Sequence, residues 1–340
     1  MAGKDGGICR IITVGFLLLT MILAGCQGKA GPLSNEAESG ISVAVPGRMA
    51  ESENAADFPG PDFGNTIDLN APSIDKDQRA QGKGSGKMIG GAPVKQGDYP
   101  DTVGVAGTDG DVRCTGVLIE PDLVLTAAHC ANQGISARVF VGWERGKWFG
   151  SYAVRGSRHG LSPSQLPAGC RSLQCARDLA VLLLDRQVAN VAPRAIAPAG
   201  VIDRASLYWA VGFGNTQSNG QGRSNIKQWA KIPSVSNSCG TYRGKADREV
   251  YGCEPGQEIV AGQMRGSADT CNGDSGGPLY TSADGKTPPA STTSYMLAGI
   301  TSRPTSQSQR LCGDGGIYER LTADAQNWIA KTETALRNGQ

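Results

Sequence analysis

The sequence lacks a strong net charge and has few aromatic residues and only two histidines. A formal net charge of +2 over 340 residues gives no reason to expect a nucleic-acid or acidic-polymer partner. Aromatic residues make up 6% of the chain whereas glycine occurs 48 times, a balance typical of a loop-rich all-β protein rather than a helical one. Beyond the N-terminal region, no apolar run is long enough to span a bilayer as a helix.

Residues 1–25 are predicted to be a signal peptide. Two basic residues precede an apolar stretch from Ile11 to Leu23, which is shorter than a typical transmembrane helix. The stretch ends in Leu-Ala-Gly-Cys at Cys26, which resembles the bacterial lipobox, whose cysteine carries lipid as the first mature residue. Gln27 follows instead of aspartate, so the resemblance implies sorting to the outer membrane of a two-membrane envelope. The alternative is an ordinary secretory signal.

Residues 26–87 form the next segment. They are rich in Gly, Ser, Asn, Asp and Pro and have no sustained helical or strand period, so we expect a disordered tether or pro-segment. A plain surface linker is the alternative. The segment ends in a flexible basic stretch from Gly82 to Lys87, and the folded region is expected to begin at Met88.

Short apolar runs separated by turn residues recur through residues 88–340. Examples are Gly116–Ile119, Leu123–Leu125 and Leu179–Leu184. This spacing indicates an antiparallel barrel or sandwich. Only the last stretch, about Ala323 to Leu336, is predicted to be helical.

Ser275 lies in a glycine-flanked turn within Cys271–Pro278, directly after Asp274. A serine hydroxyl is a poor nucleophile at neutral pH unless a base takes its proton. His129, in Thr-Ala-Ala-His-Cys at the end of an apolar run, could be that base because imidazole titrates near neutral pH. Taken alone, Gly-Asp-Ser-Gly could equally be an ordinary turn.

Asp178 opens a strand-like apolar run between these two motifs. It could be a mere strand-opening acid, but an acid there could also fix the tautomer of His129 and stabilise its imidazolium form. The order His129, Asp178, Ser275 is that of the chymotrypsin-like triad, and residues from about 88 to 340 resemble the trypsin-like serine proteases. The other histidine, His159, is given no role.

The resemblance implies an all-β fold of two six-stranded antiparallel barrels with the active site between them and a short C-terminal helix. The first barrel would span about 88–200 and the second about 201–340. It also implies a monomeric endopeptidase that acts on polypeptides through an acyl-enzyme, without cofactor or metal. The N–H groups of Gly273 and Ser275 would form the oxyanion hole.

Asp269 lies six residues before the nucleophile, where the resemblance places an acid at the base of a pocket for Arg or Lys. An exposed loop acid is the alternative. Gly316 matches the small residue that keeps this pocket open, and Ser302 matches a serine near the triad. Arg303-Pro304 departs from the family's usual Trp-Gly, which leaves the neighbouring subsites undefined and weakly suggests a preference for acidic substrate residues.

The resemblance further implies a zymogen. Cleavage after Lys87 would free the ammonium group of Met88 to fold inward and pair with Asp274. The family usually has Ile or Val at the Met88 position, and methionine is an apolar, adaptable substitute. With Cys26 lipidated, the zymogen would be held in the cell envelope and the cleaved form secreted.

The ten cysteines support export. One lies in the signal peptide and Cys26 would carry lipid, which leaves an even set that suggests four disulfides. The resemblance implies the pairs 114–130, 239–253 and 271–312, with a small 170–175 loop left over. A zinc site is the alternative, but the spacings form no metal motif with histidines. The eight cysteines are Cys114, Cys130, Cys170, Cys175, Cys239, Cys253, Cys271 and Cys312.

Two other functions fit the same fold. A catalytically silent surface adhesin is one, because a fold does not prove activity. A non-proteolytic esterase that uses the same triad is the other. The intact triad argues against the first, and Asp269 argues against the second.

Overall fold

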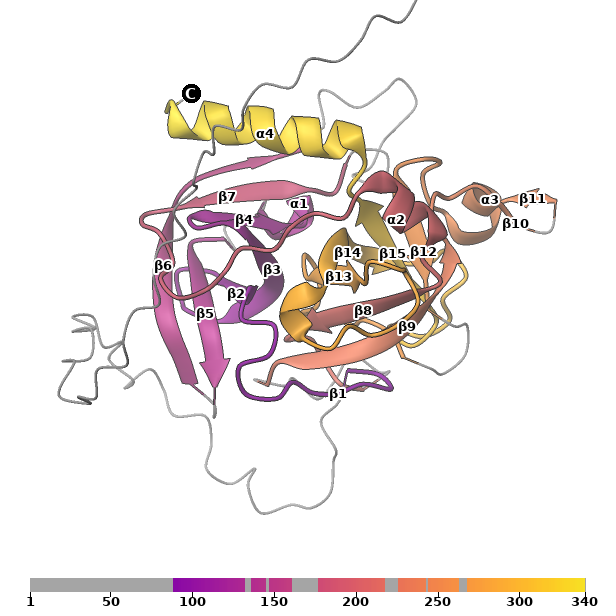
Figure 1. Cartoon of the computed structure of the whole chain (residues 1–340), viewed down its shortest axis with the longest axis horizontal. Coiled ribbons are helices and arrows are strands. Elements are labelled where there is room, and N and C mark those ends of the chain that lie inside the picture. Colours follow the sequence, from indigo (N-terminus) through magenta and orange to yellow (C-terminus); the bar gives the residue numbers. More distant parts are fainter. Residues whose placement is uncertain are drawn as a thin grey trace, which may run out of the picture. The chain divides into compact units, whose positions relative to one another are not determined.

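The computed structural model describes residues 88–131, 136–144, 147–160, 177–217, 226–242, 244–262 and 268–339. Most of their regular structure is antiparallel strand, arranged as two barrels (Figure 1). The predicted signal peptide and tether, and the predicted Cys170–Cys175 pair, lie outside the described residues. Within the described ranges, no helix is both long and apolar enough to cross a membrane.

The first barrel is closed, in the order β2-β3-β4-β7-β6-β5. Strands β4 and β7 are buried along their whole length, because they read as unbroken apolar runs rather than as alternating ones. Leucine and valine side chains from these strands fill the barrel core. The strands are β2 (Thr102–Ala106), β3 (Val112–Glu120), β4 (Leu123–Thr126), β5 (Arg138–Glu144), β6 (Lys147–His159) and β7 (Ala180–Leu184).

The second barrel is a ring of six strands, in the order β9-β12-β15-β14-β13-β8, closed by the pairing of β8 with β9. These are β8 (Leu207–Gly212), β9 (Gln228–Ser236), β12 (Glu258–Ala261), β13 (Pro278–Thr281), β14 (Met296–Pro304) and β15 (Gly316–Arg320). Strand β1 (Ala92–Pro93) adds to β9, and β10 (Thr241–Tyr242) pairs with β11 (Lys245–Ala246) in a separate two-stranded sheet. The predicted fold of two six-stranded antiparallel barrels is therefore confirmed.

Helix α4 (Ala323–Arg337) confirms the predicted C-terminal helix. Thr322 caps it by accepting a hydrogen bond from the Ala325 N–H. The helix leaves the second barrel and packs against β6 and β7 of the first (Figure 1). The sequence analysis did not predict α1 (Ala128–Ala131), α2 (Ala199–Arg204), α3 (Asp247–Tyr251) or the 3₁₀ turn η4 (Thr292–Ser294), because such short helices show no periodicity.

A buried polar cluster joins the two barrels. The Arg194 guanidinium binds both carboxylate oxygens of Asp101, at 2.5 and 2.9 Å. Tyr280, on β13, donates its hydroxyl to the same carboxylate at 2.5 Å. Because each of these polar side chains is satisfied inside the protein, the cluster fixes one mutual arrangement of the barrels, which a site shared between them requires.

The described part of the chain contains three disulfides, and all three were predicted: Cys114–Cys130, Cys239–Cys253 and Cys271–Cys312. The Cys114–Cys130 bridge ties β3 to α1, next to His129. The Cys271–Cys312 bridge ties the segment before Ser275 to the loop before β15. Two of the three bridges therefore hold segments that carry predicted site residues.

Candidate active site

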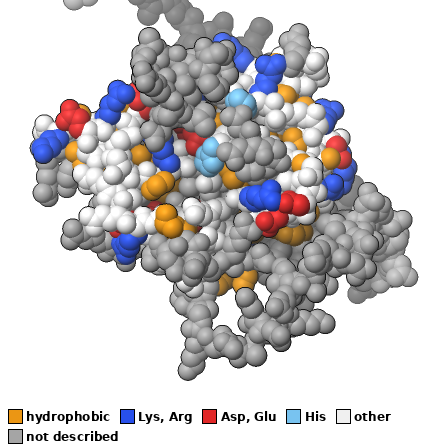
Figure 2. Space-filling view, turned by 180° about the vertical axis from the view of Figure 1, so that it is seen from behind, with side chains coloured by type: hydrophobic (Ala, Val, Ile, Leu, Met, Phe, Trp, Pro, Cys, Tyr) orange, Lys and Arg blue, Asp and Glu red, His pale blue; other side chains and the backbone are white. Residues whose placement is uncertain are grey.

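His129 and Asp178 lie together at the ends of neighbouring strands. Strands β4 and β7 pair antiparallel, with Thr126 opposite Ala180, so the segment after β4 and the segment before β7 meet at one end of the barrel. The His129 Nδ1 lies 2.8 Å from Asp178 Oδ2, and the His129 N–H donates to Asp178 Oδ1 at 3.0 Å. The His129 side chain is one-third exposed, and histidine side chains reach the surface in Figure 2. The predicted acid–imidazole pair is thus formed.

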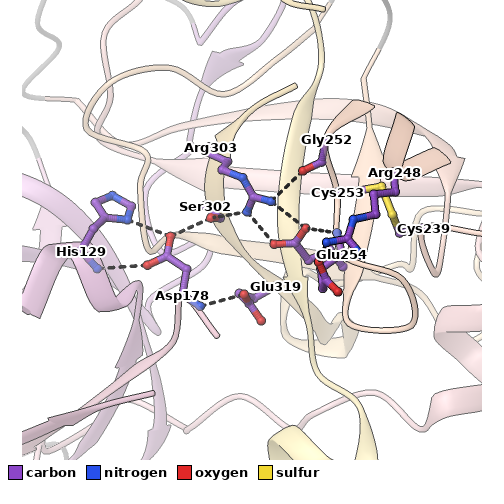
Figure 3. Close-up of polar contacts among 11 residues, drawn as sticks. His129, Asp178, Cys239, Arg248, Gly252, Cys253, Glu254, Ser302, Arg303 and Glu319 are labelled. Atoms are coloured by element: carbon purple, nitrogen blue, oxygen red, sulfur yellow. Dashed lines mark hydrogen bonds and ion pairs between the residues drawn. A yellow bond between two sulfur atoms is a disulfide. The ribbon is translucent and has the colours of Figure 1, made fainter. Parts of the chain in front are cut away.

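The second barrel contributes to the surroundings of Asp178. Ser302, on β14, donates its hydroxyl to Asp178 Oδ2 at 2.6 Å, and the Asp178 N–H donates to Glu319 on β15 at 2.7 Å (Figure 3). Burial favours a raised pKa, but the hydrogen bonds and charge of His129, with Ser302, hold the pKa of Asp178 below its usual value. Asp178 is therefore ionised at neutral pH, as an acid that stabilises an imidazolium must be.

Ser275 lies just before β13 of the second barrel, and a hydrogen bond from the first barrel holds it near this pair. The Thr115 N–H donates to the Ser275 carbonyl at 2.8 Å. Thr115 follows Cys114, whose disulfide partner Cys130 follows His129. Ser275 is thereby fixed beside the segment that carries the histidine. The Ser275 hydroxyl makes no hydrogen bond to another described residue, and such catalytic bonds often tighten only when substrate binds.

The turn before Ser275 leaves two backbone donors available. Neither the Gly273 N–H nor the Ser275 N–H donates to any residue in the described part of the chain. The Asp274 N–H instead donates to the Cys271 carbonyl at 2.9 Å, which tightens the turn. Gly273 has φ +99°, a conformation that side chains rarely adopt. These free donors match an oxyanion hole, in which each donor is worth about 10²–10³ in rate.

Asp274 is buried without a cation among the described residues. Its two carboxylate oxygens accept the N–H groups of Gly214 and Cys271, each at 2.8 Å. Burial raises its pKa to about 7. A Cβ on Gly214 would lie 2.5 Å from this carboxyl group, so only glycine fits there. Met88 is buried in the core of the second barrel, while Lys87 lies outside the described residues.

Asp269 is also buried, which contradicts the alternative of an exposed loop acid. Its Oδ2 accepts three backbone N–H groups, from Gly313, Asp314 and Gly315, at 2.8–3.1 Å. Within the described ranges, its Oδ1 accepts only the Thr270 N–H, at 2.8 Å. Burial raises its pKa to about 6, although the backbone donors oppose the rise. Backbone hydrogen bonds to Oδ2 thus orient the carboxylate, whereas Oδ1 accepts fewer hydrogen bonds.

Gly316 begins β15 beside this segment. Tyr318, two residues on, places its hydroxyl 3.2 Å from Thr270 Oγ1, next to Asp269. A Cβ on Gly316 would lie 3.2–3.3 Å from the Tyr318 ring end, tighter than most such contacts. A larger residue at this position would therefore crowd the Tyr318 ring next to Asp269, and the role of Gly316 in keeping a pocket open stays a prediction.

Arg303 does not present a free cation to acidic substrate residues, as the sequence had weakly suggested. Its guanidinium binds both oxygens of Glu258 on β12, at 2.5 and 2.9 Å. It also donates to the Gly252 carbonyl (Figure 3). Sequence reasoning missed Glu258 and Glu319. Each of these acids lies in or beside an apolar run that forms a strand, and a charge buried there needs a partner. That pattern could have indicated them.

The sulfur atoms of Cys114 and Cys130 lie close to the His129 ring. The two sulfurs are bonded to each other as a disulfide, so neither can act as the thiolate that zinc requires. This group of residues is therefore explained by the disulfide beside His129 rather than by a metal.

Comparison with known proteins agrees with this geometry. The family model described as Trypsin matches residues 88–329. A trypsin-like protease from Streptomyces glaucescens is 30% identical over 263 residues, covering 74% of this chain and 84% of the relative. Chymotrypsin-like elastase family member 1 is 25% identical in both Macaca fascicularis and Rattus norvegicus, covering 72% and 70% of this chain and 89% and 86% of the relatives. The chain belongs to the trypsin family of serine endopeptidases.

Proposed function

We propose that this protein is an exported endopeptidase that cleaves polypeptides after Arg or Lys and is made as a lipid-anchored zymogen. The observation that carries the specificity is the buried, backbone-bound carboxylate of Asp269. The curated relatives include both a trypsin-like protease and elastases, so their names do not decide the cleaved residue. The choice is argued from this chain's own side chains.

The chemistry assigned to the site is acyl transfer. The hydroxyl oxygen of Ser275 attacks the scissile carbonyl while His129 takes the hydroxyl proton. Asp178 stabilises the imidazolium that forms. The N–H groups of Gly273 and Ser275 hold the oxyanion. His129 then gives the proton to the leaving amine, and water hydrolyses the acyl-enzyme by the same steps. Ser302 supports the reaction through its hydrogen bond to Asp178.

Asp269 suits a cationic side chain. Among the described residues, its Oδ1 receives only the neighbouring Thr270 N–H, so it can accept a further donor from an ammonium or guanidinium group. A buried carboxylate without a cation is unfavourable, and a bound Lys or Arg side chain supplies the missing charge. Gly316 keeps the adjoining space open.

Activation is assigned to cleavage between Lys87 and Met88. Met88 is buried at 1% exposure in the second barrel, and the carbonyl of Ile89 accepts the Asp269 N–H at 3.0 Å. The chain after the cut is thus already bound beside the specificity segment. A new ammonium on Met88 would compensate the buried charge of Asp274. We place the zymogen at the cell envelope, anchored through Cys26, and the cleaved domain outside it as a monomer.

The Asp269→Ser variant tests the specificity. We expect cleavage after Arg and Lys to fall by about 10²–10³, because the loss of one partner of a buried charge pair costs several kcal/mol. A phosphonylating reagent should still label Ser275, which would show that the catalytic apparatus is intact. Asp109→Ser, which removes an exposed acid between β2 and β3, is the matched control and should leave activity unchanged. A wild-type preference for large apolar residues would refute the assignment.

The pH dependence gives a second test. The pKa of Asp269 is raised to about 6, so the carboxyl group becomes neutral as the pH falls through that value. We therefore expect kcat/KM for a lysyl amide, divided by kcat/KM for an apolar amide, to fall below about pH 6. Any change that affects both substrates equally cancels in the ratio. A ratio that stays constant from pH 5 to 8 would exclude Asp269 from the pocket.

A further inference from the structure

Glu319 connects the catalytic acid to the opposite barrel. It lies on β15 of the second barrel, is 2% exposed, and its Oε1 accepts the Asp178 N–H at 2.7 Å (Figure 3). Asp178 lies two residues before β7 of the first barrel. The contact therefore holds the main chain of the catalytic acid against the barrel that carries Ser275.

The basic side chains near Glu319 are each bound to another residue. Glu258 lies opposite Glu319 in the β12–β15 pairing, and the Arg303 guanidinium is bound to Glu258 rather than to Glu319. His129 is bound to Asp178. The guanidinium of Arg177, next to Asp178, donates to Thr322 at 3.4 Å. Within the described residues, Glu319 forms no ion pair of its own.

The second carboxyl oxygen of Glu319 is also without a partner. Oε2 is fully buried and has no hydrogen bond to the described residues. Burial, with the charges of Glu258 and Asp178, raises the pKa of Glu319 to about 8, although the hydrogen bond from the Asp178 N–H and the charge of Arg177 oppose this rise. Burial raises the pKa of Glu258 as well, but Arg303 opposes that rise directly because it binds Glu258. The proton is therefore held at Glu319, on the oxygen that does not accept the Asp178 N–H.

We propose that Glu319 is a positioning residue for the catalytic acid, whose neutral, protonated carboxyl group holds the Asp178 main chain without adding a second negative charge beside Asp178. The proposal rests on the catalytic role of Asp178 given above. It predicts that an uncharged amide at this position, which keeps the acceptor oxygen, works as well as the carboxyl group. It also predicts that a side chain without an acceptor does not.

Activity at pH 7 tests the hydrogen bond. We expect Glu319→Gln to keep kcat within about twofold of the wild type. Glu319→Leu should lower kcat by about ten- to a hundredfold with little change in KM, because a small displacement of a catalytic group is costly. If the wild type and both variants fail to cleave any amide, the proposed function fails. If the wild type is active and both variants lose activity equally, only the role of Glu319 fails.

Stability as a function of pH tests the proton, and it needs no active enzyme. Thermal unfolding would be measured from pH 5 to 8 in a Ser275→Ala background, which prevents self-digestion. The raised pKa of folded Glu319 keeps its proton bound up to about pH 8, whereas the unfolded side chain loses it near the ordinary glutamate pKa of 4.5, so rising pH destabilises the glutamate protein. The glutamine variant lacks this titration, and all other groups cancel in the comparison.

We therefore expect the melting temperature of Glu319→Gln, relative to the glutamate protein, to rise by several degrees between pH 5 and pH 8. A merely structural hydrogen bond would give a difference that does not depend on pH. A constant difference, or a glutamine variant that is destabilised most at pH 8, would overturn the proposal by showing that Glu319 is ionised. This pair of proteins remains informative even if Glu319→Leu does not fold.

Discussion

Replacing Ser275 or His129 by alanine is expected to lower amide hydrolysis by about 10⁶-fold, because triad residues act as a unit. The reason is geometric: the His129–Asp178 pair and the Ser275 turn are held by separate barrels and act only when both are present. The double variant should be no slower than either single one. Turnover would be measured on an amide substrate with protein that begins at Met88.

His159→Ala is the matched control for His129→Ala. His159 is the only other histidine in the chain, and its ring contacts the carbonyl of Gly160 on the strand-end loop. The account gives it no catalytic role, so this variant should retain wild-type turnover. Near-normal activity of either Ser275→Ala or His129→Ala would exclude the triad assignment.

Lys87→Gln is expected to leave the protein uncleaved, nearly inactive and attached to membranes. Asp274 is buried with two backbone N–H partners and no cation among the described residues, so the turn that carries Ser275 lacks a compensating charge until an ammonium arrives. Because residues 27–87 contain no cysteine, no disulfide can retain them after the cut. One cleavage would therefore switch the enzyme on and release it. Fractionation and N-terminal sequencing of the active form would check this.

Cys26→Ala separates the two consequences of that cleavage. This variant should lose its membrane attachment and still give normal turnover once it has been correctly cleaved. A Ser275→Ala protein that stays uncleaved would identify self-activation, whereas normal processing would indicate another protease. Fully active protein that remains on the membrane with residues 26–87 attached would contradict the coupling.

The fold and the triad could be predicted because their signals are local. Apolar runs between turn residues gave the strands, and β4, β7 and β15 formed where such runs occur. The glycine-rich turn around Ser275 and the short motif around His129 each carry their chemistry within a few residues. The C-terminal helix is long enough to show its pattern.

The contacts that support the site could not be predicted in the same way. The pairs Arg303–Glu258 and Asp178–Glu319 join residues far apart in the sequence, and each depends on strand register across a barrel or between barrels. Arg303 therefore looked like a cation available to substrate, whereas it is held by Glu258. The surroundings of Asp269 likewise depend on how the Gly313–Gly315 turn folds back.

The most direct test of the account is hydrolysis of three otherwise identical amide substrates, with arginyl, lysyl or phenylalanyl residues at the cleaved position, by the protein that begins at Met88. The buried carboxylate of Asp269 predicts that the arginyl and lysyl amides are cleaved at least about a hundredfold faster than the phenylalanyl amide. Preferential cleavage of the phenylalanyl amide, or no amide cleavage at all, would contradict it.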